Sequence, residues 1–152
     1  MKTKIIFGIL SLFFLVVVLN SCGVPGCMDP NSTNFNSKAT EDNGSCNYQG
    51  RFVFWWKKAF NDTCVKYSVA NIKIYVDGVL KGTVPASVPY YSAAPVCGSG
   101  ALTVTMDLGS SKSKQFPSYG VAVNAADVTL FTFPANNITF KGNTCVSQEY
   151  SF

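Results

Sequence analysis

The feature that most constrains the fold of this chain is a two-residue alternation of apolar and polar side chains, recurring from residue 50 to the C-terminal end. In residues 102–107, Leu102, Val104 and Met106 alternate with two threonines and an aspartate. Similar runs cover residues 52–56, 72–76, 119–123, 128–133, 138–140 and 146–152. Successive side chains of a strand point to opposite faces of a sheet, so each run predicts a strand with one buried face. Breaks every roughly 8–12 residues favour an all-β fold, an antiparallel β-sandwich of about seven or eight strands.

One connection in this region has a specific turn signal. Asp77-Gly78 lies between two apolar runs, the pattern of a tight β-hairpin. The alternation becomes ambiguous at Val79-Leu80, which predicts a bulge or a longer loop there. No stretch beyond the N-terminal apolar run predicts a helix.

The N-terminus has the pattern of an export signal. Two lysines, Lys2 and Lys4, precede an apolar run from Ile5 to Leu19. That run is shorter than the roughly 20 residues that a membrane-spanning helix needs. The sequence therefore predicts a cleaved signal rather than a permanent membrane span.

The junction Leu19-Asn20-Ser21-Cys22 resembles the bacterial lipobox, in which a small residue precedes a cysteine that becomes the first residue. The resemblance implies cleavage before Cys22 and attachment of lipid to its sulfur and its new amine. Several acyl chains hold a protein to a membrane stably. The alternative is a plain signal peptide with Cys22 free or in a disulfide. The expected organisation is a signal at 1–21, a lipidated segment at 22–49 and a sandwich domain at 50–152.

The net charge and the length of the mature chain narrow the possible classes of function. The whole chain has 12 basic and 8 acidic residues, and loss of Lys2 and Lys4 with the signal leaves a net charge of +2. A balance this mild, with scattered lysines, argues against a nucleic-acid partner. The remaining length of about 130 residues suits one domain with a short appendage.

Residues 26–48 are rich in Asn, Asp, Ser and Gly, and contain too few apolar side chains for a core. They resemble a cysteine-bracketed segment of secreted and lipid-anchored Bacteroidota proteins, with the pattern G-C-x-D-P-x-A-x-N-Y-N-x-x-A-x-x-D-D-G-S-C. The matching positions are Gly26, Cys27, Asp29, Pro30, Asn34, Phe35, Asn36, Ala39, Asp42, Gly44, Ser45 and Cys46. The bracketing cysteines imply a Cys27–Cys46 disulfide, and closing such a loop is worth about 3 kcal/mol in the chain-entropy model.

The same segment offers candidate calcium ligands. Asp29, Asn34, Asn36 and Asp42 carry the oxygen atoms that calcium prefers, although their spacing is not that of an EF-hand. The alternative is that these side chains form turns by bonding to nearby backbone groups. Calcium is the one cofactor that the sequence suggests.

The sandwich region carries a second resemblance. Phe54-Trp55, residues 74–78, Pro95-Val96-Cys97-Gly98 and Asn143-Thr144-Cys145 resemble a recurrent small domain of Bacteroidota lipoproteins. Such domains are similar to transthyretin-like and carboxypeptidase-regulatory-like sandwiches. The resemblance covers residues 50–152 and implies a fold without implying a reaction.

Three further cysteines, Cys64, Cys97 and Cys145, leave an odd thiol if Cys22 is lipidated and Cys27 pairs with Cys46. In a meander whose hairpins reverse direction at each turn, all three precede even-numbered strands and cluster at one end of the sandwich. We therefore expect one disulfide among them, and the sequence leaves open which two residues form it.

Catalytic signatures are missing. The chain contains no histidine, which excludes Ser-His-Asp and Cys-His catalysis and the commonest zinc ligand. No glycine-rich phosphate loop and no marked pair of carboxylates occur in the sequence. These patterns predict a protein that is not an enzyme.

The aromatic side chains are the remaining functional signal. Trp55 points away from the strand face that carries Phe54 and Trp56, and Tyr90 and Tyr91 lie in a proline-bounded loop. Exposed aromatic side chains are effective contacts for proteins and glycans. The alternative is that Trp55 covers the second sheet face and the tyrosines cap the sandwich.

The prediction is a lipid-anchored binding or accessory module, a subunit of an outer-membrane complex, whose partner is an envelope protein. The alternative is a surface-displayed adhesion or glycan-binding lipoprotein. Gly23-Val24-Pro25-Gly26 lacks the acidic stretch that directs related lipoproteins to the cell surface, so the periplasmic side is favoured.

Overall fold

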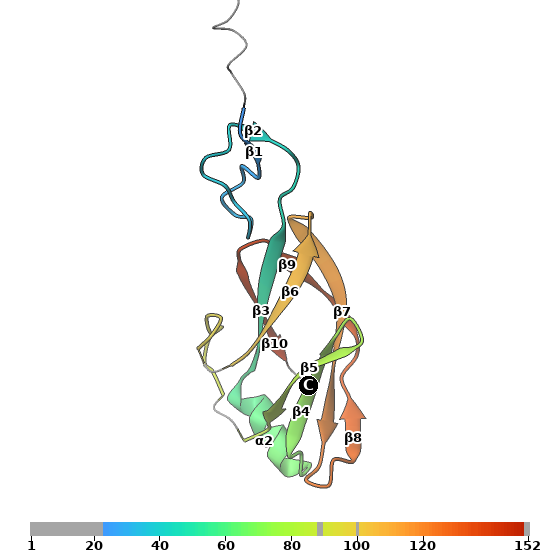
Figure 1. Cartoon of the computed structure of the whole chain (residues 1–152). Coiled ribbons are helices and arrows are strands. Elements are labelled where there is room, and N and C mark those ends of the chain that lie inside the picture. Colours follow the sequence, from blue (N-terminus) through green and yellow to red (C-terminus); the bar gives the residue numbers. More distant parts are fainter. Residues whose placement is uncertain (1–22, 88–89, 100, 151–152) are drawn as a thin grey trace, which may run out of the picture.

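The computed structural model describes residues 23–87, 90–99 and 101–150. Two sheets face each other and a small N-terminal segment lies at one end (Figure 1). The three-stranded sheet has the order β10-β3-β6, and the five-stranded sheet has the order β5-β4-β7-β8, with β9 also paired to β7. The strands are β3 (Tyr48–Trp56), β4 (Asn71–Val76), β5 (Val79–Pro85), β6 (Leu102–Gly109), β7 (Ser113–Val123), β8 (Thr129–Thr132), β9 (Asn136–Lys141) and β10 (Cys145–Tyr150).

The core lies between the two sheets. On β3, Phe52, Phe54 and Trp56 are buried on the inner face, and Ile72 and Ile74 face them from β4. These positions alternate as the sequence predicts because each strand contributes every second side chain to the core. The predicted all-β sandwich is confirmed.

One short helix departs from the prediction. Helix α2 (Lys58–Lys66) lies at the end of the sandwich opposite the N-terminal segment (Figure 1). It buries Phe60 and Cys64, which are four residues apart and so share one helix face. The expectation of no helix was wrong because two buried apolar side chains in nine residues give too weak a periodic signal, and the helix has neither a side-chain N-cap nor an acidic first turn.

The hairpin prediction at Asp77-Gly78 is confirmed. Both residues have positive φ, 54° and 73°, as a tight hairpin between β4 and β5 requires. The pairing passes from Ile74–Gly82 to Tyr75–Leu80, so Lys81 is the extra residue of a bulge. The bulge falls directly after the ambiguous Val79-Leu80 pair.

The strand order differs from a simple meander, because β10 runs parallel to β3. This pairing aligns Cys145 with Arg51, near the start of β3, whereas Cys64 lies on α2 beyond the end of β3. Cys145 bonds to Cys97, and Cys64 is the free cysteine among the described residues. The expected clustering of all three cysteines is therefore wrong for Cys64.

Residues 23–47, which we call the cystine segment, form a separate small unit. Strands β1 (Pro25–Gly26) and β2 (Glu41–Asp42) pair in parallel, and the predicted Cys27–Cys46 disulfide is present. The sandwich begins with β3 at Tyr48, two residues before the boundary expected from the sequence.

The described fold does not test the predicted membrane anchor. Cys22 and the signal at 1–21 lie outside the described residues. Among the residues that the structure describes, α2 included, no helix is long and apolar enough to cross a membrane.

Candidate functional site

The outer face of the three-stranded sheet is divided into a covered part and an open part. The connection between β5 and β6 crosses the covered part, where the Tyr91 N–H donates to the Trp56 carbonyl at 3.0 Å. Further along, the Gly98 N–H donates to Thr103 Oγ1 at 2.9 Å, and Thr103 is the cross-strand neighbour of Val53. The Cys97–Cys145 disulfide ties this connection to β10. Val53 is consequently completely buried although it points away from the core.

Trp55 lies on this covered part and is only 6% exposed. Its strand neighbour Glu149 forms an ion pair with Lys57 at 2.9 Å, and the Lys57 ammonium lies 6.0 Å from the indole ring centre. This burial favours the alternative that Trp55 covers the second sheet face, and its part in partner binding stays a prediction. Tyr90 remains 48% exposed, whereas Tyr91 is half-buried.

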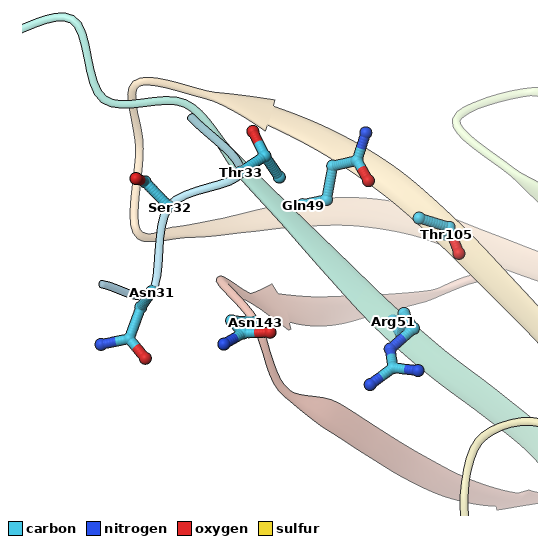
Figure 2. Close-up of a pocket in the computed structure, with 7 residues that line it drawn as sticks. All are labelled: Asn31, Ser32, Thr33, Gln49, Arg51, Thr105 and Asn143. Carbon is cyan, nitrogen blue, oxygen red and sulfur yellow. The ribbon is translucent and has the colours of Figure 1, made fainter. Parts of the chain in front are cut away.

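The open part of the same face forms a polar pocket of about 270 Å³. Figure 2 shows that its walls come from β3, β6, the turn between β9 and β10, and the cystine segment. The lining residues are Asn31, Ser32, Thr33, Gln49, Arg51, Thr105 and Asn143. Every one of these side chains carries a hydrogen-bonding group, and none is aromatic or aliphatic.

The sandwich supplies the rigid wall of the pocket. Gln49 and Arg51 are two residues apart on β3 and so point to the same face, and Thr105 is the cross-strand neighbour of Arg51. Asn143 adopts a positive φ of 52° in the turn after β9, and its N–H donates to the Gln49 carbonyl at 2.8 Å. The Arg51 N–H donates to the Thr144 carbonyl at 3.0 Å, so two backbone hydrogen bonds join this turn to β3.

The cystine segment supplies the opposite wall. Asp29 Oδ2 accepts a hydrogen bond from the Tyr48 hydroxyl at 2.8 Å and forms an ion pair with Lys112 at 2.7 Å. The hydrogen bond from Lys112, the Asn31 N–H and the Tyr48 hydroxyl hold the pKa of Asp29 well below its ordinary value. The Thr33 N–H also donates to the Asn47 carbonyl at 2.8 Å. These contacts hold residues 31–33 beside the sandwich.

Arg51 is the one arginine of the chain. Among the described residues it makes no ion pair, whereas Lys57, Lys58, Lys73 and Lys112 each contact a carboxylate. The pocket lining contains no acidic side chain. A planar guanidinium on a central strand, surrounded by amides and hydroxyls, is suited to binding an anionic group in a defined orientation.

The candidate calcium ligands are engaged in local hydrogen bonds. Asn34 Oδ1 accepts from the Asn47 N–H at 2.8 Å, Asn36 Oδ1 from the Lys38 N–H at 3.0 Å, and Asp42 Oδ1 from the Gly44 N–H at 3.0 Å. Within the described part of the chain, no three His, Cys, Asp or Glu side chains gather in an arrangement that could hold a metal ion. The contacts favour the turn-forming alternative, and calcium binding stays a prediction.

Sequence reasoning did not identify the pocket. Two signals pointed to it: the sole arginine of the chain, and the outward positions of β3, which change from polar at Gln49 and Arg51 to apolar at Val53 and Trp55. The convergence of residues 31–33, 105 and 143 on that strand depends on the tertiary fold. No protein-family model, curated protein or solved structure matches the chain.

Proposed function

We propose that this chain is a lipid-anchored, non-catalytic binding module of the bacterial cell envelope, with its ligand site in the polar pocket around Arg51. The observation that carries the proposal is the lining of that pocket, which consists of one guanidinium, three amides and three hydroxyls. Such groups recognise a polar ligand by directional hydrogen bonds.

The lining favours binding over turnover. It contains no carboxylate or cysteine, and the chain has no histidine. General acid–base catalysis requires a group that gains and loses a proton near the working pH. The side chains around this pocket offer donors and acceptors rather than such a group.

The proposed lipid on Cys22 would keep the pocket close to the membrane surface. Asn31 follows Cys22 by nine residues, so even a fully extended chain keeps this wall of the pocket within about 30 Å of the acylated cysteine. A pocket so close to the anchor samples molecules near the membrane surface. The periplasmic side of the outer membrane is our proposed location, and protease treatment of intact cells tests it, since degradation from outside contradicts this placement.

The binding function is tested on the full mature chain in detergent micelles, with backbone amide NMR spectra recorded during titration. The ligand set contains neutral and acidic sugars, short peptides and nucleotides. We expect at least one of these ligands to shift the amide signals of Gln49, Arg51, Thr105 and Asn143. Binding of every active ligand elsewhere, or of none, would contradict the proposal.

A second candidate is a protein partner that contacts the β5–β6 connection. Tyr90 is 48% exposed there and Val96 is 72% exposed, so the connection presents apolar surface to solvent. A cross-linked pull-down from native membranes, repeated with Tyr90→Ala and Tyr91→Ala, tests this surface. Retention of every partner by both folded variants assigns the tyrosines to packing.

A further inference from the structure

We infer that the ligand of the pocket is an acidic saccharide, with Arg51 binding its carboxylate. This inference rests on the proposed function and names the chemical class of its ligand. It depends on three properties of the pocket: its single charge, the exposed polar side chains around that charge, and its size.

The charge of the pocket matches one monoanion. Arg51 is the only charged side chain of the lining. The nearby Lys112 is held by Asp29 at 2.7 Å, so its charge is already balanced by the protein. A guanidinium forms two parallel hydrogen bonds with a carboxylate, which fixes the orientation of the ligand as well as its charge. A phosphate monoester with about two charges would leave an excess negative charge in this site.

The groups around Arg51 match a hydroxylated ligand. The side chains of Asn31, Gln49, Thr105 and Asn143 are exposed, and none of them hydrogen-bonds to another described residue. Each amide offers both donors and an acceptor, and the threonine hydroxyl offers both roles. Sugar hydroxyls also act in both roles, so they can satisfy this mixed set.

Two hydroxyls of the lining already donate a hydrogen bond within the protein and can still accept one from a ligand. Ser32 Oγ donates to the Asp29 carbonyl at 2.8 Å, and Thr33 Oγ1 donates to the Asn47 carbonyl at 3.1 Å. Their donor capacity is therefore directed to the backbone, while their lone pairs remain for a ligand hydroxyl. None of the seven lining residues has an aromatic or purely aliphatic side chain, so the directional contacts of a ligand here are hydrogen bonds.

The position and size of the pocket limit the ligand to about one sugar ring. In the view of Figure 2, the Arg51 guanidinium and the amides of Asn143 and Asn31 lie along one edge of the pocket, with Gln49 and Thr33 on the other side. A volume of about 270 Å³ lies just below the range of roughly 300–1,000 Å³ for small-ligand sites. The expected ligand is a uronic acid, free or at the end of a glycan.

The test compares matched sugars on the full mature chain in detergent micelles at physiological salt. Galacturonate and glucuronate are titrated against galactose and glucose by calorimetry, with wild type, Arg51→Gln, Arg51→Lys and the charge control Lys66→Gln. Lys66 lies at the end of α2, away from the pocket. We expect the acids to bind about tenfold or more tighter than the neutral sugars. Arg51→Gln should remove that preference, Arg51→Lys should lose most of it, and Lys66→Gln should retain it.

Three outcomes overturn the inference. They are equal affinity for galactose and galacturonate, acid binding that Arg51→Gln leaves unchanged, and tighter binding of glucose 6-phosphate or of a short peptide than of either uronate. In each case a ligand that still shifts the pocket amides leaves the proposed binding function standing. If no ligand shifts the amides of Gln49, Arg51, Thr105 or Asn143, both proposals fail together.

Discussion

The carboxylate of Asp29 accepts a hydrogen bond from the hydroxyl of Tyr48 at 2.8 Å, and this contact joins the cystine segment to the first strand of the sandwich. Tyr48 is 3% exposed, so its ring is part of the core while its hydroxyl reaches the segment. One wall of the pocket comes from residues 31–33, directly after Asp29. The geometry of the pocket therefore depends on how firmly these two residues connect the two parts.

The first prediction concerns the pH dependence of this contact. The folded-state pKa of Asp29 is lowered, first by the Lys112 hydrogen bond, so the ionised carboxylate stabilises the fold. Its contribution is complete above the ordinary pKa of 3.8 and decreases as the pH falls below that value toward the folded pKa. We expect Asp29→Asn to lower the thermal midpoint by a few degrees at neutral pH. The difference from wild type should narrow steadily toward about pH 2. An equal difference at both pH values would contradict this linkage.

The second prediction concerns the disulfide that ties down the β5–β6 connection. Cys97 and Cys145 are separated by 48 residues, and a loop of that length contributes about 4 kcal/mol to the free energy of unfolding in the chain-entropy model. The variant with both residues changed to serine should also expose Trp55 and shift tryptophan emission to longer wavelength. The matched control changes Cys27 and Cys46 to serine and should leave the emission unchanged. Identical spectra for both variants would show that the disulfide does not keep Trp55 covered.

The third prediction concerns the crossing of β3 and β9. A Cβ atom at Gly50 would lie 2.9 Å from Phe140 Cβ and 3.0 Å from the Lys141 carbonyl oxygen. Gly50→Ala should therefore lower the free energy of unfolding by about 1–3 kcal/mol, because neither neighbour can move without shifting the strand. Gly23→Ala is the control, since its closest neighbour is the end of the flexible Glu41 side chain. Urea denaturation measures the free energy of unfolding of both variants. A Gly50→Ala variant as stable as wild type would contradict the close approach of β3 and β9.

The fourth prediction concerns the free thiol. Cys64 is completely buried, and burial raises its pKa to about 11. The thiolate is the reactive form of cysteine, so iodoacetamide should leave Cys64 unmodified in the native protein at about pH 8. Addition of denaturant should permit modification of this one residue while both disulfides stay intact. Mass spectrometry of peptides identifies the site, and rapid native-state labelling at Cys64 would contradict its burial.

The fifth prediction concerns the proposed anchor. Cys22→Ser removes the sulfur to which the lipid would attach, so it should abolish palmitate labelling and release the protein from membranes. Several acyl chains give essentially permanent attachment, so release should be nearly complete. Labelling of the variant at the wild-type level would refute lipidation at Cys22.

The sequence by itself determined which side chains enter the core. Leu102, Val104 and Met106 all pack in or against the core, as their alternation predicts. The turn at Asp77-Gly78 and the Cys27–Cys46 disulfide were equally predictable. These features depend on neighbouring residues, on turn chemistry, or on two cysteines that bracket a short segment. Their signals are therefore local.

The tertiary structure alone decided the remaining disulfide, the burial of Trp55 and the pocket. Cys145 reaches Cys97 because β10 returns parallel to β3, and that pairing leaves no mark in the alternation of either strand. Trp55 and Arg51 occupy equivalent outward positions on β3, yet the β5–β6 connection covers the first and leaves the second open. Strand periodicity specifies which face a side chain occupies, whereas what lies over that face depends on contacts between residues far apart in the chain.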